Sequence, residues 1–252
     1  MPKLLACIDG SVYSNSVADH AAWAAERLGA SVELLQVLPR REASSEDRSG
    51  RIGIAARRRL LEQLAELDAE RAKVLHEKGW LELDEARQRV EALGISDVRT
   101  SLRHGDLLET LAEREASADL VVVGKRGEAA DFAQLHLGSN LERMLRASHR
   151  PVLVASRAFR PIERFMIAFD ARSSALRAVD AVSRSPLFAG LEGTIVTVGS
   201  EKGEARRRLE DAARQLRSGG LSVSERLESG EPDTVIPKLV ESEGIDLLVM
   251  GA

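Results

Sequence analysis

The chain of 252 residues has a formal net charge of −4, and 30% of its residues are charged, a composition that indicates a soluble protein. This balance provides no overall positive field for nucleic acid or acidic membranes, and a single cysteine, Cys7, excludes an intrachain disulfide. The sequence has neither an apolar run of about 20 residues nor a signal-peptide pattern. We therefore expect a cytoplasmic protein with no membrane or nucleic-acid partner.

Short apolar runs alternate with amphipathic patterns in the first part of the chain. The run Asp119–Gly124 reads DLVVVG, as expected of a strand buried on both faces. Strands separated by helices indicate crossover connections and a parallel α/β sheet. Strands are predicted over Lys3–Ile8, Ser31–Leu38, Val98–Arg103, Asp119–Gly124 and Pro151–Ala155, and helices over Ser14–Leu28, Leu107–Ala116 and Asn140–Ala147.

The same order of elements begins again near residue 163, which indicates an internal duplication. Asp170 follows the first strand of the second half as Asp9 follows that of the first, and DLLVMG at 246–251 nearly copies DLVVVG. We expect one repeat over 1–156 and a second over 162–252, paired as an intramolecular pseudo-dimer, with a homodimer as a further possibility. The second repeat stops after its fourth strand, which suggests a truncated chain or an omitted tail.

The first repeat is the longer one because of a helical insertion at about 40–95. A helix is predicted over Ile54–His76, with leucines recurring on one side, and a second helix over Leu83–Leu93. This insertion is interpreted either as a helical cover on the sheet or as an arm that binds a partner.

The segment after Asp119–Gly124 contains two glycine turns around the start of a helix. It begins Gly-Lys-Arg-Gly at 124–127 and ends Gly-Ser-Asn at 138–140. Glycine lets backbone amides approach an anion, and the first amides of a helix are unpaired. Lys125 and Arg126 would add positive charge. The pattern therefore suits phosphate, although the same residues also suit an ordinary turn and helix cap.

Together, the strand-ending Asp9, the DLVVVG-KRG and GSN segments and HRPVLVAS at 149–156 resemble the universal stress protein family. The resemblance covers both repeats and implies open five-stranded, doubly wound sheets of order 3-2-1-4-5. Nucleotide-binding members show Gly-x2-Gly-x9-Gly-Ser/Thr, whereas ten residues separate Gly127 from Gly138 here. The extra residue must bulge from the loop.

The resemblance implies a site for ATP or a related adenine nucleotide, accompanied by Mg²⁺ or Mn²⁺. Asp9 would contact the adenine or ribose, and Val37 would line the base pocket. The residues expected to approach the ribose and phosphates are Gly124, Arg126, Gly127, Gly138, Ser139 and Asn140.

Three functions remain open at this stage. The first is a nucleotide-binding stress or regulatory protein with one site per chain, because the second repeat keeps Asp170 but has no phosphate loop. No residue is identified as a catalytic base or metal ligand, so at most a slow ATPase is expected. The second is a structural or interaction module that has lost its ligand. The third, an adenylating enzyme, is disfavoured because Asp9-Gly10-Ser11-Val12 lacks the usual Ser-Gly-Gly-x-Asp-Ser motif.

Overall fold

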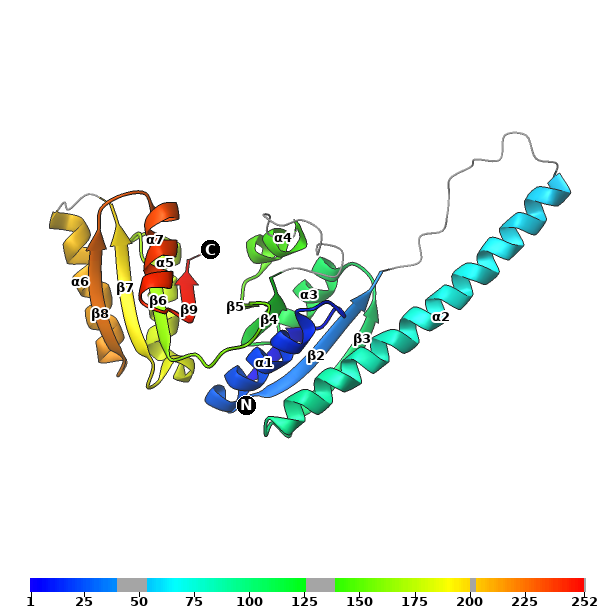
Figure 1. The fold of residues 1–252 in the computed structure, drawn as a ribbon, viewed down its shortest axis with the longest axis horizontal. Coiled ribbons are helices and arrows are strands. Elements are labelled where there is room, and N and C mark those ends of the chain that lie inside the picture. Colours follow the sequence, from blue (N-terminus) through cyan, green and yellow to red (C-terminus); the bar gives the residue numbers. More distant parts are fainter. Residues whose placement is uncertain (40–53, 126–138, 200–202, 252) are drawn as a thin grey trace. The chain divides into compact units, whose positions relative to one another are not determined.

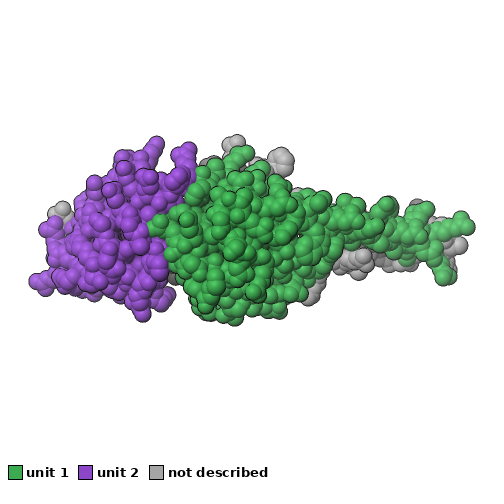
Figure 2. Space-filling model, turned by 90° about the horizontal axis from the view of Figure 1, so that it is seen from below, with its two compact units in different colours: residues 1–159 green, residues 160–252 purple. Residues whose placement is uncertain are grey.

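A computed structural model describes residues 1–39, 54–125, 139–199 and 203–251 of the chain. It divides the chain into two compact units, Met1–Phe159 and Arg160–Ala252, which Figure 2 shows in different colours. Each unit is a parallel sheet covered by helices (Figure 1). The expected α/β class is therefore confirmed.

The first unit contains a five-stranded sheet of order β3-β2-β1-β4-β5, as predicted. Its elements are β1 (Lys3–Cys7), α1 (Ser14–Leu28), β2 (Ser31–Leu38), α2 (Ile54–Ala92), β3 (Val98–His104), α3 (Leu107–Glu115), β4 (Leu120–Gly124), α4 (Ser139–Ala147) and β5 (Val152–Ala155).

Alternate residues of these strands enter two different apolar layers, because successive side chains of a strand point to opposite faces. Leu5, Leu35 and Val121 pack with Leu111 of α3 and Met144 of α4. Helices α1 and α2 pack against each other and against the strands from the other face. A few large aliphatic side chains thus fill both layers, as expected of a chain with 3% aromatic residues.

Helix α2 is a single helix of 39 residues, whereas two shorter helices were predicted. The prediction of two helices was wrong, because the chain stays helical through Gly79, which lies between the two predicted segments. Gly79 is buried inside the helix, and a Cβ there would lie 3.0 Å from Cδ1 of Leu102. The missing side chain therefore lets α2 approach β3 closely and does not end the helix.

The second unit contains a four-stranded sheet of order β8-β7-β6-β9, in agreement with the predicted end of the repeat after its fourth strand. The sequence did not predict its short 3-10 helix, Pro186–Phe188. The other elements are β6 (Arg164–Ala168), α5 (Ser173–Arg184), β7 (Glu192–Val198), α6 (Gly203–Ser218), β8 (Ser222–Glu228), α7 (Pro232–Ser242) and β9 (Leu247–Met250). Across the described residues of both units, no helix has the length and apolar character needed to span a membrane.

Glu33 is a buried charge within the first sheet. Its carboxylate lies 2.5 Å from Nζ of Lys3 on β1 and 3.4 Å from Nη1 of Arg114 on α3. The second repeat has no charged residue here, because Thr194 occupies the equivalent register position on β7. Two cations balance one carboxylate here, which ties α3 to the sheet.

We predict that Glu33→Gln lowers the free energy of unfolding by about 1–3 kcal/mol, because it leaves two partly buried cations without their counter-charge. Urea unfolding measures this loss. The control is Glu192→Gln, whose side chain is 81% exposed and 3.6 Å from Arg164, and which should change stability by less than about 0.5 kcal/mol. Equal effects of the two variants would contradict the role given to Glu33.

Candidate functional site

The strand register brings three predicted site residues to one edge of the first sheet. The backbone ladders pair Cys7 with Leu35 and Ala6 with Val122, and the first continues through a 2.8 Å bond from Ile8 N to Leu35 O. Extending them places Asp9 level with Val37 on one side and with the end of β4, just past Gly124, on the other. Adjacent strands lie about 4.8 Å apart.

This edge is where ligands bind in open α/β sheets. Strand β1 lies at the centre of the sheet, and the chain order runs away from it in opposite directions through β2 and β4. At such a reversal point open α/β sheets form a ligand-binding crevice, because the connections to the following helices run to opposite faces of the sheet.

Asp9 is exposed and shapes the turn between β1 and α1. Its Oδ1 atom accepts hydrogen bonds from Ser11 N (3.0 Å) and Ser14 Oγ (3.3 Å). Among the residues that the structure describes, none donates to Oδ2 of Asp9. The Oδ1 atom of Asp9 thus holds the turn.

Val37 and Cys7 are the apolar residues near Asp9 at this edge of the sheet. Both are partly buried and pack against the cluster that includes Leu35 and Val123. Desolvation by burial, followed by the nearby charge of Asp9, raises the pKa of the Cys7 thiol to about 12. This thiol therefore stays protonated near neutral pH and is unsuited to nucleophilic or redox chemistry.

Helix α4 begins at the same edge of the sheet. It follows β4 and precedes the parallel strand β5, so its first residue lies on the side where β4 ends. Leu141 and Met144 are buried and fix its inner face. Ser139 and Asn140 occupy its first turn, so their backbone amides belong to the positive end of the helix.

The far end of α4 is held by Glu115 at the end of α3. One carboxylate oxygen accepts from Ser148 Oγ at 2.6 Å, and the other accepts from the backbone N of His149 at 3.1 Å. Although burial alone would raise it, these bonds lower the pKa of Glu115. The remaining predicted site residues, Arg126, Gly127 and Gly138, lie outside the described part of the chain.

Sequence reasoning missed Glu82, a residue of α2 that lies at the Asp9 turn. Its Oε2 atom accepts a 2.7 Å hydrogen bond from Nε2 of Gln36, which is buried on β2. Gly10 has φ +72°, and a Cβ built there would overlap the Glu82 carboxylate. Because Glu82 belongs to the long insertion, no local motif links it to Asp9.

The second unit repeats the turn but not its surroundings. Oδ1 of Asp170 accepts from Arg172 N at 2.9 Å, as Asp9 accepts from Ser11. Ala171 takes the place of Gly10 and has φ 60°, the one positive φ at a non-glycine residue in the described chain. The turn has thus kept its left-handed backbone after losing its glycine.

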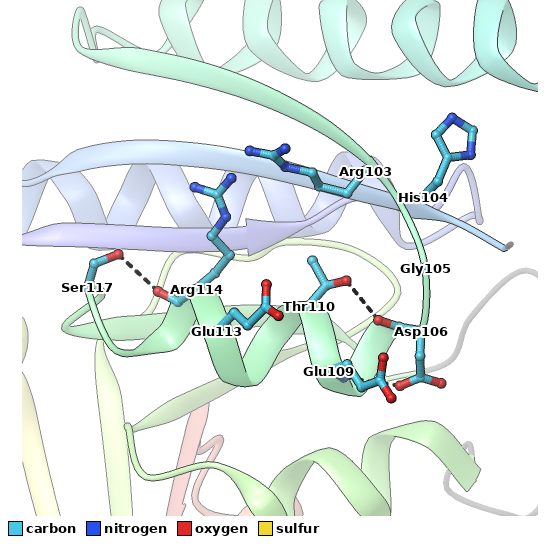
Figure 3. A pocket seen from close by; sticks show the side chains of 9 residues that line it. All are labelled: Arg103, His104, Gly105, Asp106, Glu109, Thr110, Glu113, Arg114 and Ser117. Atoms are coloured by element: carbon cyan, nitrogen blue, oxygen red, sulfur yellow. Dashed lines mark hydrogen bonds between the residues drawn. The ribbon is translucent and has the colours of Figure 1, made fainter.

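A separate cavity of about 470 Å³ lies along α3 at the edge of the sheet (Figure 3). His104 is one of the residues that line it. Its wall mixes cations such as Arg103 with anions such as Glu109 and Glu113. Asp106 is engaged in capping α3, where its Oδ1 accepts from Leu108 N at 2.8 Å. Because cations and anions both line the cavity, its charge favours neither an anionic nor a cationic ligand.

Two parallel α/β sheets, each with an aspartate after the strand that starts its unit, are typical of the universal stress fold. The model of the universal stress protein family matches residues 1–156 and again residues 157–252. The chain therefore belongs to the universal stress protein family, as the sequence had suggested.

Several relatives are similar over nearly the whole chain. Universal stress protein Slr1230 of Synechocystis is 34% identical over 257 residues, covering 100% of this chain and 90% of the relative. The crystal structure of a universal stress protein from Archaeoglobus fulgidus is 22% identical with a TM-score of 0.68, and covers 98% of this chain and 86% of its own. A putative universal stress protein from Pseudomonas aeruginosa is 19% identical with a TM-score of 0.59, over 99% and 82%. These solved structures share the fold.

We predict that Gly10→Ala lowers the free energy of unfolding by about 1–3 kcal/mol, because it strains a left-handed residue and displaces Glu82. Adding Glu82→Ala to this variant should recover part of the loss, which a double-mutant cycle in urea measures. The control Ala171→Gly should shift stability by less than about 1 kcal/mol, because relief of strain and loss of chain entropy oppose each other. Purely additive effects of Gly10→Ala and Glu82→Ala would rule out their contact.

Proposed function

We propose that the first repeat binds an adenine nucleotide, ATP or a close relative, and that the protein is a cytoplasmic stress-response regulator. One observation carries this proposal: Asp9, Val37 and the end of β4 are level at the edge where the strand order reverses, and α4 begins at that same edge. Membership of the universal stress protein family supports the regulatory role.

The side chains suit the base and sugar of a nucleotide. Oδ2 of Asp9 has no donor among the described residues and can accept from a ribose hydroxyl or the exocyclic amine of adenine. Val37 offers a partly buried apolar surface to the base. Lys125 follows β4 directly, is exposed, and provides positive charge beside the crevice.

The backbone suits the phosphates. The first four amides of a helix have no partner within it, so the start of α4 offers donors to an anion. The described residues contain no group of three or more potential metal ligands. A Mg²⁺ or Mn²⁺ ion would therefore bind through the phosphate oxygens, where it neutralises their charge. Gly124, Arg126, Gly127, Gly138, Ser139 and Asn140 are the proposed phosphate and ribose contacts.

We propose a single site per chain and, at most, slow hydrolysis. The second repeat keeps Asp170 and its turn, but Ala171 and Arg172 stand where the first repeat has Gly10 and Ser11. We assign no residue of the described site as a general base. Binding would then act as a signal more than as a step in turnover.

We predict that calorimetry with ATP and Mg²⁺ gives one site per chain with micromolar affinity, roughly −8 kcal/mol. Asp9→Asn should weaken binding at least about tenfold, because the amide oxygen can still hold the turn while the second acceptor oxygen is lost. Asp170→Asn makes the same change in the second repeat and should leave the affinity unaltered. No heat at millimolar ATP would refute the proposal.

A ligand-free interaction module is the second candidate, and one observation favours it. Asp9 is already used by its own turn, and the Glu82 carboxylate lies against Gly10, so two negative charges lie close together at the edge where an anionic ligand would bind. Native mass spectrometry of gently purified protein separates the two candidates. We expect a mass increment equal to an adenine nucleotide, whereas a bare chain that also gives no heat with ATP would favour the interaction module.

A further inference from the structure

The first half of helix α2 extends away from the unit that carries it. Every described side chain from Arg58 to Arg71 is exposed, whereas Leu83, Ala86 and Val90 near the other end are buried against the body of the unit. Figures 1 and 2 show this part of α2 protruding from the first unit. Residues 58–78, here named the arm, span about 31 Å at 1.5 Å per residue.

An apolar stripe runs along the arm and just beyond it, defined as Leu60, Leu64, Leu67, Val74 and Leu81. These side chains are 46–73% exposed. Their spacing alternates four and three residues when Arg71 and Lys78 are included, which is the heptad spacing of a coiled coil. The stripe lies about a third of a turn away from the buried face of α2, so the body of the unit does not cover it.

The exposed apolar stripe of α2 should be stabilised by packing against another apolar surface. Isolated helices gain most of their stability by packing an apolar face, and those of about 12–15 residues are marginal in water. Fourteen consecutive described positions, from Arg58 to Arg71, pack against nothing in the chain's described part. A contiguous row of exposed leucines on a helix is also the signature of an interaction surface.

We propose that the arm pairs with the arm of a second copy of this chain as an antiparallel two-stranded coiled coil. The pairing centres between Leu67 and Arg71. It places Leu64 opposite Val74 of the second copy, Leu67 opposite Arg71 of the second copy, and Leu60 opposite Lys78 of the second copy. Each layer occurs twice by two-fold symmetry, and the stems of the cations cover the leucines.

Charge selects this orientation. A parallel pair in register would place Arg71 opposite Arg71 of the second copy, and Lys78 opposite Lys78 of the second copy, inside the same apolar layers. The antiparallel pair separates these cations and brings Arg71 beside Asp68 of the second copy. Since residues 79–90 pack on the sheet, the antiparallel pair also keeps the two sheets at opposite ends of the coil.

Sedimentation of the full chain, without nucleotide, tests this pairing. We expect a dimer at tens of micromolar, and the double variant Leu64→Glu/Leu67→Glu should weaken dimerisation at least about 100-fold, because it buries four carboxylates. The matched control Ala69→Glu adds a carboxylate on the opposite, exposed side of the same helix and should leave the dimer intact. Thermal unfolding of all three proteins confirms that the first unit is folded.

A second measurement fixes the orientation. A spin label at Arg59→Cys, in a Cys7→Ser background, should lie about 30 Å along the coil from its counterpart, because residue 59 faces residue 79 of the second copy. A parallel pair would bring the two labels to about 10 Å. A monomeric wild-type chain, a dimer that survives Leu64→Glu/Leu67→Glu, or the short label distance would each overturn the proposal.

Discussion

The backbone ladder between β1 and its two neighbours is the constraint on which the rest of the first unit depends. It sets Asp9 level with Val37 on one side and with the end of β4 on the other. The apolar layers keep that register, because a slip of one residue would turn Leu5 and Leu35 out of their layer. Glu33, between Lys3 and Arg114, adds a polar tie between the same strands and α3. The strand order, more than any single side chain, therefore determines where the candidate site lies.

The two repeats share this ladder but have diverged around it. Asp170 holds its turn as Asp9 does, yet Ala171 occupies a left-handed position where the first repeat has glycine. Thr194, which contacts Ser224 Oγ at 3.1 Å, stands at the register position of Glu33. The two units therefore share the turn after their first strand and differ at these neighbouring positions.

Much of the fold follows from local patterns in the sequence. The buried run DLVVVG, the aspartates after β1 and β6, and the alternation of strands and helices were sufficient for both sheets and the four-stranded end of the second. The failures have physical causes. Gly79 lies inside a helix at a position where a side chain would press against Leu102 of β3. A single sequence does not reveal this tertiary contact. Glu82 reaches the Asp9 turn only through tertiary packing. Asp9, Val37 and Gly124 lie at one edge of the sheet, but their role in a binding site stays a prediction, as does that of the loop residues Arg126, Gly127 and Gly138.

The contact between Glu82 and the Gly10 turn gives α2 a mechanical property. A continuous helix is stiff, and the distance from residue 82 to residue 58 is about 36 Å. A tilt of about 5° at the end that touches the turn would therefore move the other end by about 3 Å, comparable to the displacement that distinguishes two packing states of a helix interface. Helix α2 therefore couples the turn after β1 to the arm. A small rearrangement of this turn produces a larger displacement at residue 58.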